Sequence, residues 1–513
     1  MPHATRLLPN FYRDSVSLMQ LSSVLAKLAG VEQVSVIMAS PANLGLLRDA
    51  GLLKDALAAS PNDLLVAVQA KTPAALAAAI AEAERLLREE PRATAGDGTA
   101  APTAPRSLEM ALARDPAANL ALISTPGDYA AAEAMKALRL DMNVMLFSDN
   151  VGVGDEIALK TLARERGLLV MGPDCGTAII NGVPLAFANV VRRGSIGCVG
   201  ASGTGLQQVT CLIDRMGLGI SQAIGTGGHD LHASVGGITM LAGIEALGRD
   251  PQTKVIVLIS KPPSPEVAKR VLAAASKTGK PVVVSFVGAD PRSITGPNLH
   301  PVKTLEDAAR AAVALAKGRK PAARRAAGKV PAFRLAAGQR YVRGLYSGGT
   351  FCYEATLLLG EALGSIRSNT PVRASDAIED PWHSAEHTVI DLGDDMFTRG
   401  RPHPMIDHRL RNERILKEAA DPQVAVILLD VVLGYGAHPD PAAEMIPVIE
   451  AARARAAKKK RRIAFVGFVC GTSADPQDLV AQERALTKAG MLLATSNAEA
   501  VRLAAAIAGR AAR

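Results

Sequence analysis

The chain has 513 residues, of which 48% are hydrophobic and 21% are charged. A chain this apolar can bury several cores, which excludes general disorder, and its 45 glycines and 31 prolines follow no fixed period, which excludes a collagen-like rod. Its 5 cysteines form no CxxC pair, a pattern that predicts free thiols and no zinc site. Without a long apolar run or a signal sequence, we expect a cytoplasmic protein with no membrane partner.

The formal net charge of +9 could indicate nucleic-acid binding. Many of the basic residues, however, sit in two short runs at 317–329 and 453–462, and aromatic residues are only 3% of the chain. A single-stranded nucleic acid needs aromatic side chains for its bases to stack on. We therefore interpret the charge as solvated surface and expect no nucleic-acid partner.

Two segments rich in small residues and proline divide the chain, and we predict linkers at 90–107 and 318–336. Before the first linker, residues 1–89 alternate short strands with helices and predict a small α+β domain of ferredoxin-like size. The strands are expected at 6–8, 33–38 and 63–69, and the helices at 14–28 and 72–88.

The rest of the chain alternates continuous Val/Ile/Leu runs with helical segments, the pattern of parallel sheets that are covered on both faces. We predict an α/β fold with tandem doubly wound domains: a Rossmann-like, CoA-binding-type domain at 108–193 and flavodoxin-like domains at 194–317 and 337–513. The expected strands lie at 119–124, 143–147, 168–171, 195–199, 220–224, 254–259, 281–286, 341–346, 388–392, 424–431, 462–466 and 491–494.

The last two domains can be laid on each other. Residues 197–205 (GCVGASGTG) match 344–350 (GLYSGGT), and the second, third and fourth strands of each domain follow in the same order. Residues 224–230 match 390–395, 255–260 match 426–431, and 282–288 match 463–470. This order predicts an internal duplication of one flavodoxin-like unit.

Both copies place small residues where a strand meets the start of a helix. Glycine lets a ligand approach the backbone, and the first amides of a helix attract anions, so the pair predicts a phosphate site. Each loop alone could also be a tight structural turn. Neither loop completes a dinucleotide-binding or Walker motif. The candidate substrate- or phosphate-binding residues are Ser202, Gly203, Thr204, Gly205, Gly227, Gly228, Gly348, Gly349, Thr350, Asp174 and Asp395.

A second concentration of charge lies at 391–407 (DLGDDMFTRGRPHPMID), just past a predicted strand. Arg399 and Arg401 could bind a carboxylate or phosphate with two hydrogen bonds each, and His403 could contact a carbonyl oxygen or move a proton. With Asp394, these form the candidate catalytic set, although a solvated loop can carry similar charge.

Three further side chains have ordinary explanations. Cys175 follows a Gly-Pro-Asp turn and has no histidine nearby in sequence, so a nucleophilic role is the less favoured reading. His229 and His232 are spaced to ligate a metal, but a polar loop pair is more common, and we predict no metal site.

At these residues a family resemblance becomes specific. GPDCGT, GASGTG, GTGG and VIVLIS, in this order, resemble the α subunit of succinyl-CoA synthetase, and YSGGT, IDLGDD and LLDVVLGYGA resemble the CoA-ligase domain of its β subunit. The chain is more similar still to the FdrA family, through FYRDSVSLMQ, ASPANLGLL, NVMLFSDNV and GRPHPMID as well. That resemblance implies a subunit of oxamate carbamoyltransferase in allantoin breakdown, which converts oxalurate and phosphate to oxamate and carbamoyl phosphate with companion subunits.

Two departures from the ligases qualify what the resemblance implies. The segment after 286–290 is short and its His300 lacks the motif that carries phosphohistidine, and no ATP-grasp domain is present. We therefore expect phosphate or carbamoyl phosphate as a substrate, a ureido acid as the other, an oligomeric enzyme with companion subunits, and CoA only as a possible cofactor. A CoA-ligase subunit and a non-catalytic assembly subunit are the alternatives.

Overall fold

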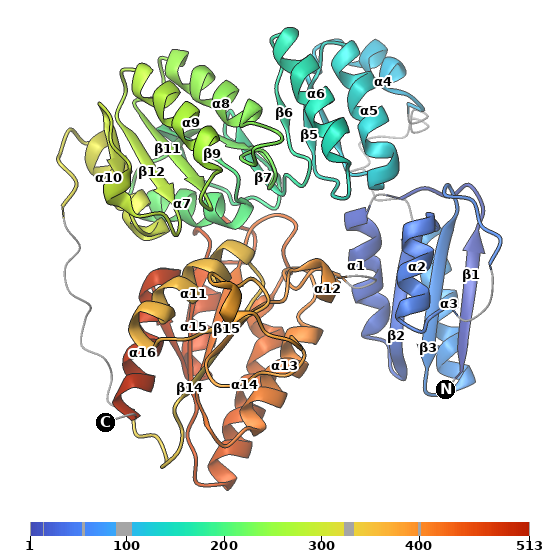
Figure 1. Cartoon of the computed structure of the whole chain (residues 1–513). Helices are drawn as coiled ribbons and strands as arrows, with labels where there is room; N and C mark the ends of the chain where they lie inside the picture. Colours follow the sequence, from blue (N-terminus) through green and yellow to red (C-terminus); the bar gives the residue numbers. More distant parts are fainter. Residues whose placement is uncertain are drawn as a thin grey trace. The chain divides into compact units, whose positions relative to one another are not determined.

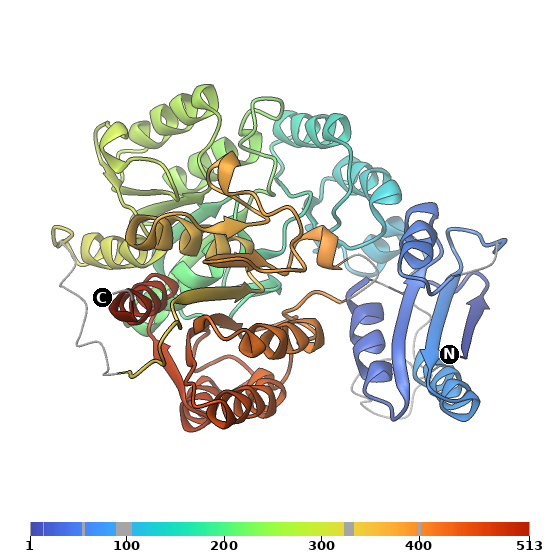
Figure 2. The same ribbon diagram turned by 60° about the horizontal axis from the view of Figure 1, so that its bottom comes forward.

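A computed structural model describes residues 2–13, 15–53, 57–88, 105–322, 333–398 and 402–511. The chain forms two compact units, one of residues 1–168 with 395–406 and the other of residues 169–394 with 407–513 (Figures 1 and 2). Within the described ranges, no helix is long and apolar enough to cross a membrane.

The first unit begins with an antiparallel sheet in the order β1-β3-β2. Alternate residues of β2 and β3 point to opposite faces, so Val36 and Val66 join one core with α1 and α3, while Leu65 joins a second core with α2. This small α+β domain agrees with the prediction for the N-terminal segment. The elements are β1 (His3–Leu8), α1 (Ser15–Ala26), β2 (Val31–Met38), α2 (Pro41–Asp49), β3 (Leu64–Ala70) and α3 (Pro73–Arg88).

The same unit continues with a short α/β segment in which β4 and β5 pair in parallel and α5 packs on both strands and on α6. The helix α4 begins at the N-cap Ser107, whose side chain accepts a hydrogen bond from the amide of Met110. The elements are α4 (Leu108–Arg114), β4 (Leu120–Ile123), α5 (Gly127–Arg139), β5 (Asn143–Leu146), α6 (Val153–Glu165) and, later in the chain, α12 (Asp395–Thr398).

The second unit opens with β6 (Val170–Met171) and contains two lobes. The first lobe is a seven-stranded sheet in the order β13-β12-β11-β9-β10-β7-β8, with α8 and α9 on one face and α7 and α10 on the other (Figure 1). Its elements are β7 (Thr177–Ile180), β8 (Val183–Ala186), β9 (Arg193–Gly200), α7 (Gly203–Arg215), β10 (Ile220–Gly225), α8 (Ile238–Arg249), β11 (Val255–Ser260), α9 (Pro265–Lys277), β12 (Val282–Phe286), the 3-10 helix η1 (Pro291–Ser293), β13 (Leu299–Pro301) and α10 (Leu305–Ala316).

The second lobe is a six-stranded parallel sheet in the order β15-β16-β14-β17-β18-β19, with α11 and α16 on one face and α13, α14 and α15 on the other. Its elements are β14 (Tyr341–Tyr346), α11 (Gly349–Leu363), β15 (Arg367–Ser368), the 3-10 helix η2 (Ala374–Asp376), β16 (Thr388–Asp391), α13 (Arg409–Ala420), β17 (Val424–Val432), α14 (Pro441–Lys458), β18 (Ala464–Cys470), α15 (Leu479–Lys488), β19 (Met491–Ala494) and α16 (Asn497–Ala511).

The two lobes share one topology, which confirms the predicted fold class and the order of the internal repeat. In the first lobe the parallel strands run β10-β9-β11-β12-β13, and in the second, apart from the two-residue edge strand β15, they run β16-β14-β17-β18-β19. Both orders are 2-1-3-4-5 when the strands are numbered along each repeat, which is the flavodoxin-like order. The strands β11 and β17 are buried along their whole length, as continuous apolar runs predict.

The structure adds three short strands to the first lobe that the sequence pattern did not indicate: β13 at one edge, and the hairpin of β7 and β8 at the other. The hairpin of β7 and β8 joins the sheet, with β7 antiparallel to β10, although it precedes the predicted domain boundary at 193 and 194. A hairpin is compatible with an otherwise parallel sheet when it adds antiparallel strands at an edge. The predicted domain boundaries themselves stay predictions.

Buried polar contacts hold the two lobes of the second unit together. The side-chain amide of Asn189 donates to the carbonyl of Leu433 at 2.8 Å and to the Asp475 carboxylate at 2.7 Å. The guanidinium of Arg215, in the last turn of α7, donates to the carbonyls of Val469 and Gly471 at 2.9 Å each. These contacts fix the lobes so that α7 and α11 pack against each other.

Candidate functional site

The starts of α7 and α11 meet between the two lobes of the second unit. Ser202 is the N-cap of α7, and its Oγ accepts a hydrogen bond from the Gly205 amide at 2.9 Å. The same Oγ lies 2.6 Å from Oγ1 of Thr350, in the first turn of α11, and both hydroxyl groups are buried. The structure therefore brings together the two loops that the internal repeat singled out.

Glycine at position 348 permits this approach. A Cβ atom at Gly348 would lie 2.9 Å from Cγ2 of Thr204, on the opposing helix start. Any larger residue would push the two helix starts apart, because the atoms of a folded interior have no room to give by several tenths of an ångström. The small residues of the second loop thus serve close packing of α11 on α7.

The first amides of α7 and α11 differ in what they bind. At α7, the amides of Gly203 and Thr204 have no acceptor within the helix, because the first turn has no preceding carbonyls. At α11, the Gly348 amide donates to the Asp430 carboxylate at 2.9 Å, so this amide already has an anionic acceptor within the protein. The amides of Gly349 and Thr350, one step further on, likewise have no acceptor within their helix.

Asp430 lies near the end of β17 and anchors the loop before α11. Its carboxylate accepts hydrogen bonds from the amide and the hydroxyl of Ser347, at 2.9 and 2.8 Å, and forms a 2.9 Å ion pair with Arg411 of α13. Neither charged side chain is exposed at all, and burial lowers the pKa of Arg411 although Asp430 opposes that effect. This buried pair holds the loop in place and compensates the Asp430 charge.

Asp391, the last residue of β16, places a second carboxylate at the start of α11. Its Oδ1 accepts a hydrogen bond from the Gly393 amide at 2.9 Å, and its Oδ2 would lie 2.6 Å from a Cβ atom at Gly349. Burial raises the pKa of Asp391 to about 7, against the lowering effect of the Gly393 amide, and the nearby charge of Asp394 raises it further. This carboxyl group can therefore exchange a proton near neutral pH.

Lys261 contributes positive charge to the same place and was not predicted. It follows β11, and its ammonium group lies 5.1 Å from the centre of the Tyr353 ring, one turn into α11. Its charge favours the ionised form of Asp391 and so acts to lower the pKa of that group. A lone lysine after a strand gives no sequence signal, since only the fold places it beside the other lobe.

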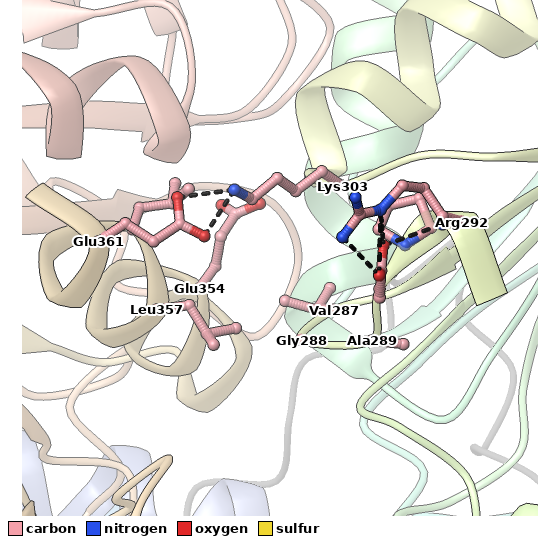
Figure 3. Close-up of a pocket in the computed structure, with 11 residues that line it drawn as sticks. Val287, Gly288, Ala289, Arg292, Lys303, Glu354, Leu357 and Glu361 are labelled. Carbon is pink, nitrogen blue, oxygen red and sulfur yellow. Dashed lines mark hydrogen bonds and ion pairs between the residues drawn. The ribbon is translucent and has the colours of Figure 1, made fainter.

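A pocket of about 580 Å³ lies beside α11, between that helix and the loop after β12 (Figure 3). Lys303 extends across it to the Glu361 carboxylate at 2.6 Å, and Arg292 pairs with Asp290 at 3.0 Å. Glu354 lines its inner wall, where burial raises the pKa of this carboxyl group to about 7 despite a hydrogen bond from the Leu305 amide. Because its cations already have anionic partners, the pocket is a weaker anion site than the helix starts.

The remaining glycine loop forms a separate group with Asp174. Gly227 has a positive φ of 84°, and a side chain there would collide with the carbonyl of Pro173. A Cβ atom at Gly228 would lie 3.5 Å from Oδ2 of Asp174, so the structure makes these two candidate residues neighbours. The Thr226 amide donates to the Gly200 carbonyl at 2.9 Å, which ties this group to the strand that precedes α7.

The predicted catalytic segment is only partly within the described residues. Arg399 and Arg401 lie outside them, and His403 and Asp395 belong to the first unit, whereas Asp394 belongs to the second. The His403 ring accepts a hydrogen bond from the Met405 amide at 3.2 Å. The roles assigned to these residues therefore stay predictions.

The other candidates have structural explanations. The Cys175 thiol is buried and donates to the Thr177 carbonyl at 3.6 Å. The rings of His229 and His232 lie 5.2 Å apart, and the described residues contain no cluster of three potential metal ligands. His300 lies in β13, paired with Val283 of β12, and burial lowers its pKa.

Comparison with known proteins places this architecture in a family. The chain is 44% identical to the uncharacterized protein YahF of Escherichia coli (strain K12) over 495 residues, which cover 95% of each chain. The chain belongs to the YahF family. This YahF-family chain also matches the family models described as CoA-ligase at residues 345–507, as CoA binding domain at 191–288, and as AllF, heavy metal-associated domain at 1–104.

More distant relatives share only part of this YahF-family chain. It is 31% identical over 181 residues to the succinate–CoA ligase [ADP-forming] subunit alpha-2 of Trichomonas vaginalis, and 28% identical over 181 residues to the corresponding alpha subunit of Aquifex aeolicus (strain VF5). Those matches cover 33% and 34% of this chain and 56% and 58% of the relatives, so it spans little more than half of their length. It therefore has domains of the succinyl-CoA synthetase type behind an AllF-like N-terminal domain.

Two solved structures match this chain at low similarity. The ATP citrate lyase of Methanothrix soehngenii in complex with citrate and coenzyme A is 12% identical, with a TM-score of 0.34 over 79% of this chain and 84% of that one. The apo form of the dinucleotide-forming acetyl-coenzyme A synthetase 1 of Ca. Korarchaeum cryptofilum is 15% identical, with a TM-score of 0.32 over 77% of this chain and 83% of that one.

The N-terminal domain does not fit the heavy-metal ligand of its family description. Residues 1–104 contain no cysteine and one histidine, His3, so this domain lacks the thiolate donors of soft metal sites. The CoA binding domain model covers residues 191–288, which include the start of α7, so CoA is a possible ligand by family.

Proposed function

We propose that the chain is a subunit of a carbamoyltransferase that cleaves oxalurate with phosphate to oxamate and carbamoyl phosphate, together with companion subunits in the cytoplasm. The observation that carries the proposal is the 2.6 Å contact between Ser202 and Thr350, which joins the starts of α7 and α11 in one place. Two helix starts that point to one place form a site for a phosphate group. The AllF-like N-terminal domain supports the link with ureido-acid metabolism.

In this proposal the phosphate binds where the two lobes meet. The amides of Gly203 and Thr204 donate to it from α7, and those of Gly349 and Thr350 from α11. Lys261 supplies a full positive charge to complement it. The ion pair of Asp430 with Arg411 keeps the second loop rigid, so the donors are in place before the anion arrives.

The ureido acid is the second substrate of this proposal, and the sequence pattern at 391–407 supplies candidate residues for it. Arg399, Arg401 and His403 hold its carboxylate and polarise its ureido carbonyl, because arginine pairs with carboxylates through two parallel hydrogen bonds. The further candidate contacts from the sequence are Asp394, Asp395, Asp174, Gly227 and Gly228. A phosphate oxygen then attacks the ureido carbon, and the bond from that carbon to the oxamate nitrogen breaks.

The test is phosphate-dependent breakdown of oxalurate by the purified chain, with and without the companion subunits, followed as carbamoyl phosphate. We expect turnover that needs phosphate and the companions but neither nucleotide nor CoA. A Ser202→Ala variant should raise the KM for phosphate, while Ser107→Ala, which removes the N-cap hydroxyl of α4 instead, serves as the matched control. Absence of carbamoyl phosphate in every mixture would refute the proposal.

A second candidate is the CoA-ligase reaction, which the matches at 191–288 and 345–507 favour. It predicts thioester formation from a carboxylic acid, ATP and CoA when a nucleotide-binding partner is present. Thioester formation, with no reaction of oxalurate, would replace the first proposal by this one. A non-catalytic assembly role predicts instead that no loop variant lowers the activity of the complex.

A further inference from the structure

The proposed reaction transfers one proton as well as the carbamoyl group. Hydrogen phosphate loses its proton when its oxygen bonds to the ureido carbon, and the oxamate nitrogen gains a proton when its bond to that carbon breaks. The products are carbamoyl phosphate and oxamate, and the count of protons is unchanged. One carboxyl group can perform both transfers if it accepts the first proton and then donates it.

Asp391 has the position that this transfer requires. It ends β16 at the carboxyl edge of the second-lobe sheet, and its Oδ2 points at Gly349, the first residue of α11. The residue is only 8% exposed, and the Gly393 amide donates to Oδ1 rather than to this Oδ2. The backbone of Asp391 is held on both sides by the Asn369 side chain, at 2.9 and 3.0 Å, so the carboxyl group is fixed.

We propose that Asp391 is the acid–base catalyst of the site at the starts of α7 and α11, an inference that rests on the proposed carbamoyl transfer. Its carboxylate accepts the proton of the attacking hydrogen phosphate, and the resulting carboxylic acid donates that proton to the leaving oxamate nitrogen. Aspartate and glutamate act in this way when their pKa lies near the working pH.

The charges around Asp391 suit both steps. Asp394 in the following loop and Asp430 on β17 disfavour the carboxylate, and burial does so most strongly, which together bring its pKa to about 7. Lys261, from the end of β11, favours the carboxylate. The Cys352 thiol on α11 also faces it, and burial holds the pKa of that thiol high, so the thiol stays neutral.

The neighbouring buried carboxylates are committed to other partners. Asp430 accepts from Ser347 and Gly348 and pairs with Arg411, so its lone pairs are engaged. Glu354, one turn along α11, accepts from the Leu305 amide and from the Asn497 side chain at 2.8 Å each. Among these carboxyl groups, Asp391 differs because its Oδ2 atom faces the start of α11.

The experiment measures carbamoyl phosphate formation from oxalurate and inorganic phosphate by the complete complex. Asp391→Asn should lower kcat by about 100-fold or more, the usual contribution of a general acid–base group, with less than about a fivefold change in the KM for phosphate. Asp380→Asn, which removes an exposed carboxylate of the same lobe, is the control and should stay near wild type. Circular dichroism checks that each variant is folded.

Chemical rescue separates a catalytic role from a structural one. Asp391→Ala leaves room beside Gly349, and added formate should restore turnover in proportion to its concentration. Asp391→Asn should also lose the limb of the rate–pH profile that the wild type shows near neutral pH. If Asp391→Asn does not fold, Asp391→Ser, which keeps an acceptor for the Gly393 amide, takes its place.

The outcomes are distinct. A wild-type complex that turns over oxalurate, with Asp391 variants that keep more than about a third of its rate, refutes the role of Asp391 alone. Variants that lose activity, gain nothing from formate and keep the wild-type pH profile also refute it. A wild-type complex that forms no carbamoyl phosphate refutes the proposed function, and this inference with it.

Discussion

Replacement of Asp430 by asparagine tests whether the buried ion pair organises the second lobe. The substitution removes the negative charge but leaves Arg411 unexposed at 0% and without its 2.9 Å partner. A buried charge that loses its partner costs about 3–5 kcal/mol in the free energy of unfolding. For a domain of 150–250 residues, at roughly 2–4 °C per kcal/mol, that corresponds to a fall in Tm of about 6–20 °C.

The protein contains one tryptophan, Trp382, which lies in the second lobe between η2 and β16. Its fluorescence during urea unfolding therefore reports on this lobe, and far-UV circular dichroism reports on the whole chain. Glu245→Gln is the control, because it removes an exposed helix pair with Arg249, whose side chains are 60% and 80% exposed. Such a pair contributes about 0.3–0.5 kcal/mol.

A double variant shows whether Asp430→Asn loses stability because the Arg411 charge is no longer compensated or because a hydrogen bond is lost. Arg411→Met with Asp430→Leu removes both charges, and should recover most of the stability that Asp430→Asn loses, since an apolar pair avoids the cost of burying ions. A loss below about 1 kcal/mol in Asp430→Asn would refute the reasoning. It would mean that the Arg411 charge reaches water or another acceptor.

Four further predictions concern the site and its surroundings. Thr350→Val should weaken phosphate binding about tenfold, because it removes the hydroxyl that contacts Ser202, and titration with inorganic phosphate measures this; unchanged affinity would make the contact purely structural. Gly203→Val should abolish phosphate dependence, since its Cβ atom would lie 3.1 Å from Thr177 Oγ1; retained dependence would show that the turn is structural. Arg401→Ala should raise the KM for oxalurate or stop turnover, and an unchanged rate would remove Arg401 from the site. Glu354 has a pKa raised to about 7 by burial, so its contribution to stability is complete below its unfolded value of 4.5 and is lost as the pH rises through 7. The free energy of unfolding of Glu354→Gln, relative to that of the wild type, should therefore increase by up to about 3 kcal/mol between pH 5 and pH 8, as measured by denaturant unfolding at each pH. A difference between the two proteins that does not change with pH would argue against the raised pKa of Glu354.

The sequence alone determined the order of the elements and the fold class. Mostly apolar runs such as 255–260 and 424–431, the second with Asp430 near its end, indicate strands covered on both faces, and their alternation with helices leads to parallel sheets. The repeated strand–turn–helix pattern predicted two equivalent lobes, and both have the order 2-1-3-4-5. It also drew attention to the loops at Ser202 and Thr350, because glycine-rich helix starts are a local signal.

Only the tertiary structure decided which residues share the site. Asp391, Asp430 and Arg411 come from three elements and Lys261 from the loop after β11, and no spacing along the chain relates them. The hairpin of β7 and β8 was missed for a similar reason, since a short strand is recognised by its partner across the sheet. The local sequence pattern predicts a helix or a strand because the interactions that form it lie within a few residues. The burial, the electrostatic surroundings and the pKa of a side chain depend instead on neighbours that only the folded chain supplies.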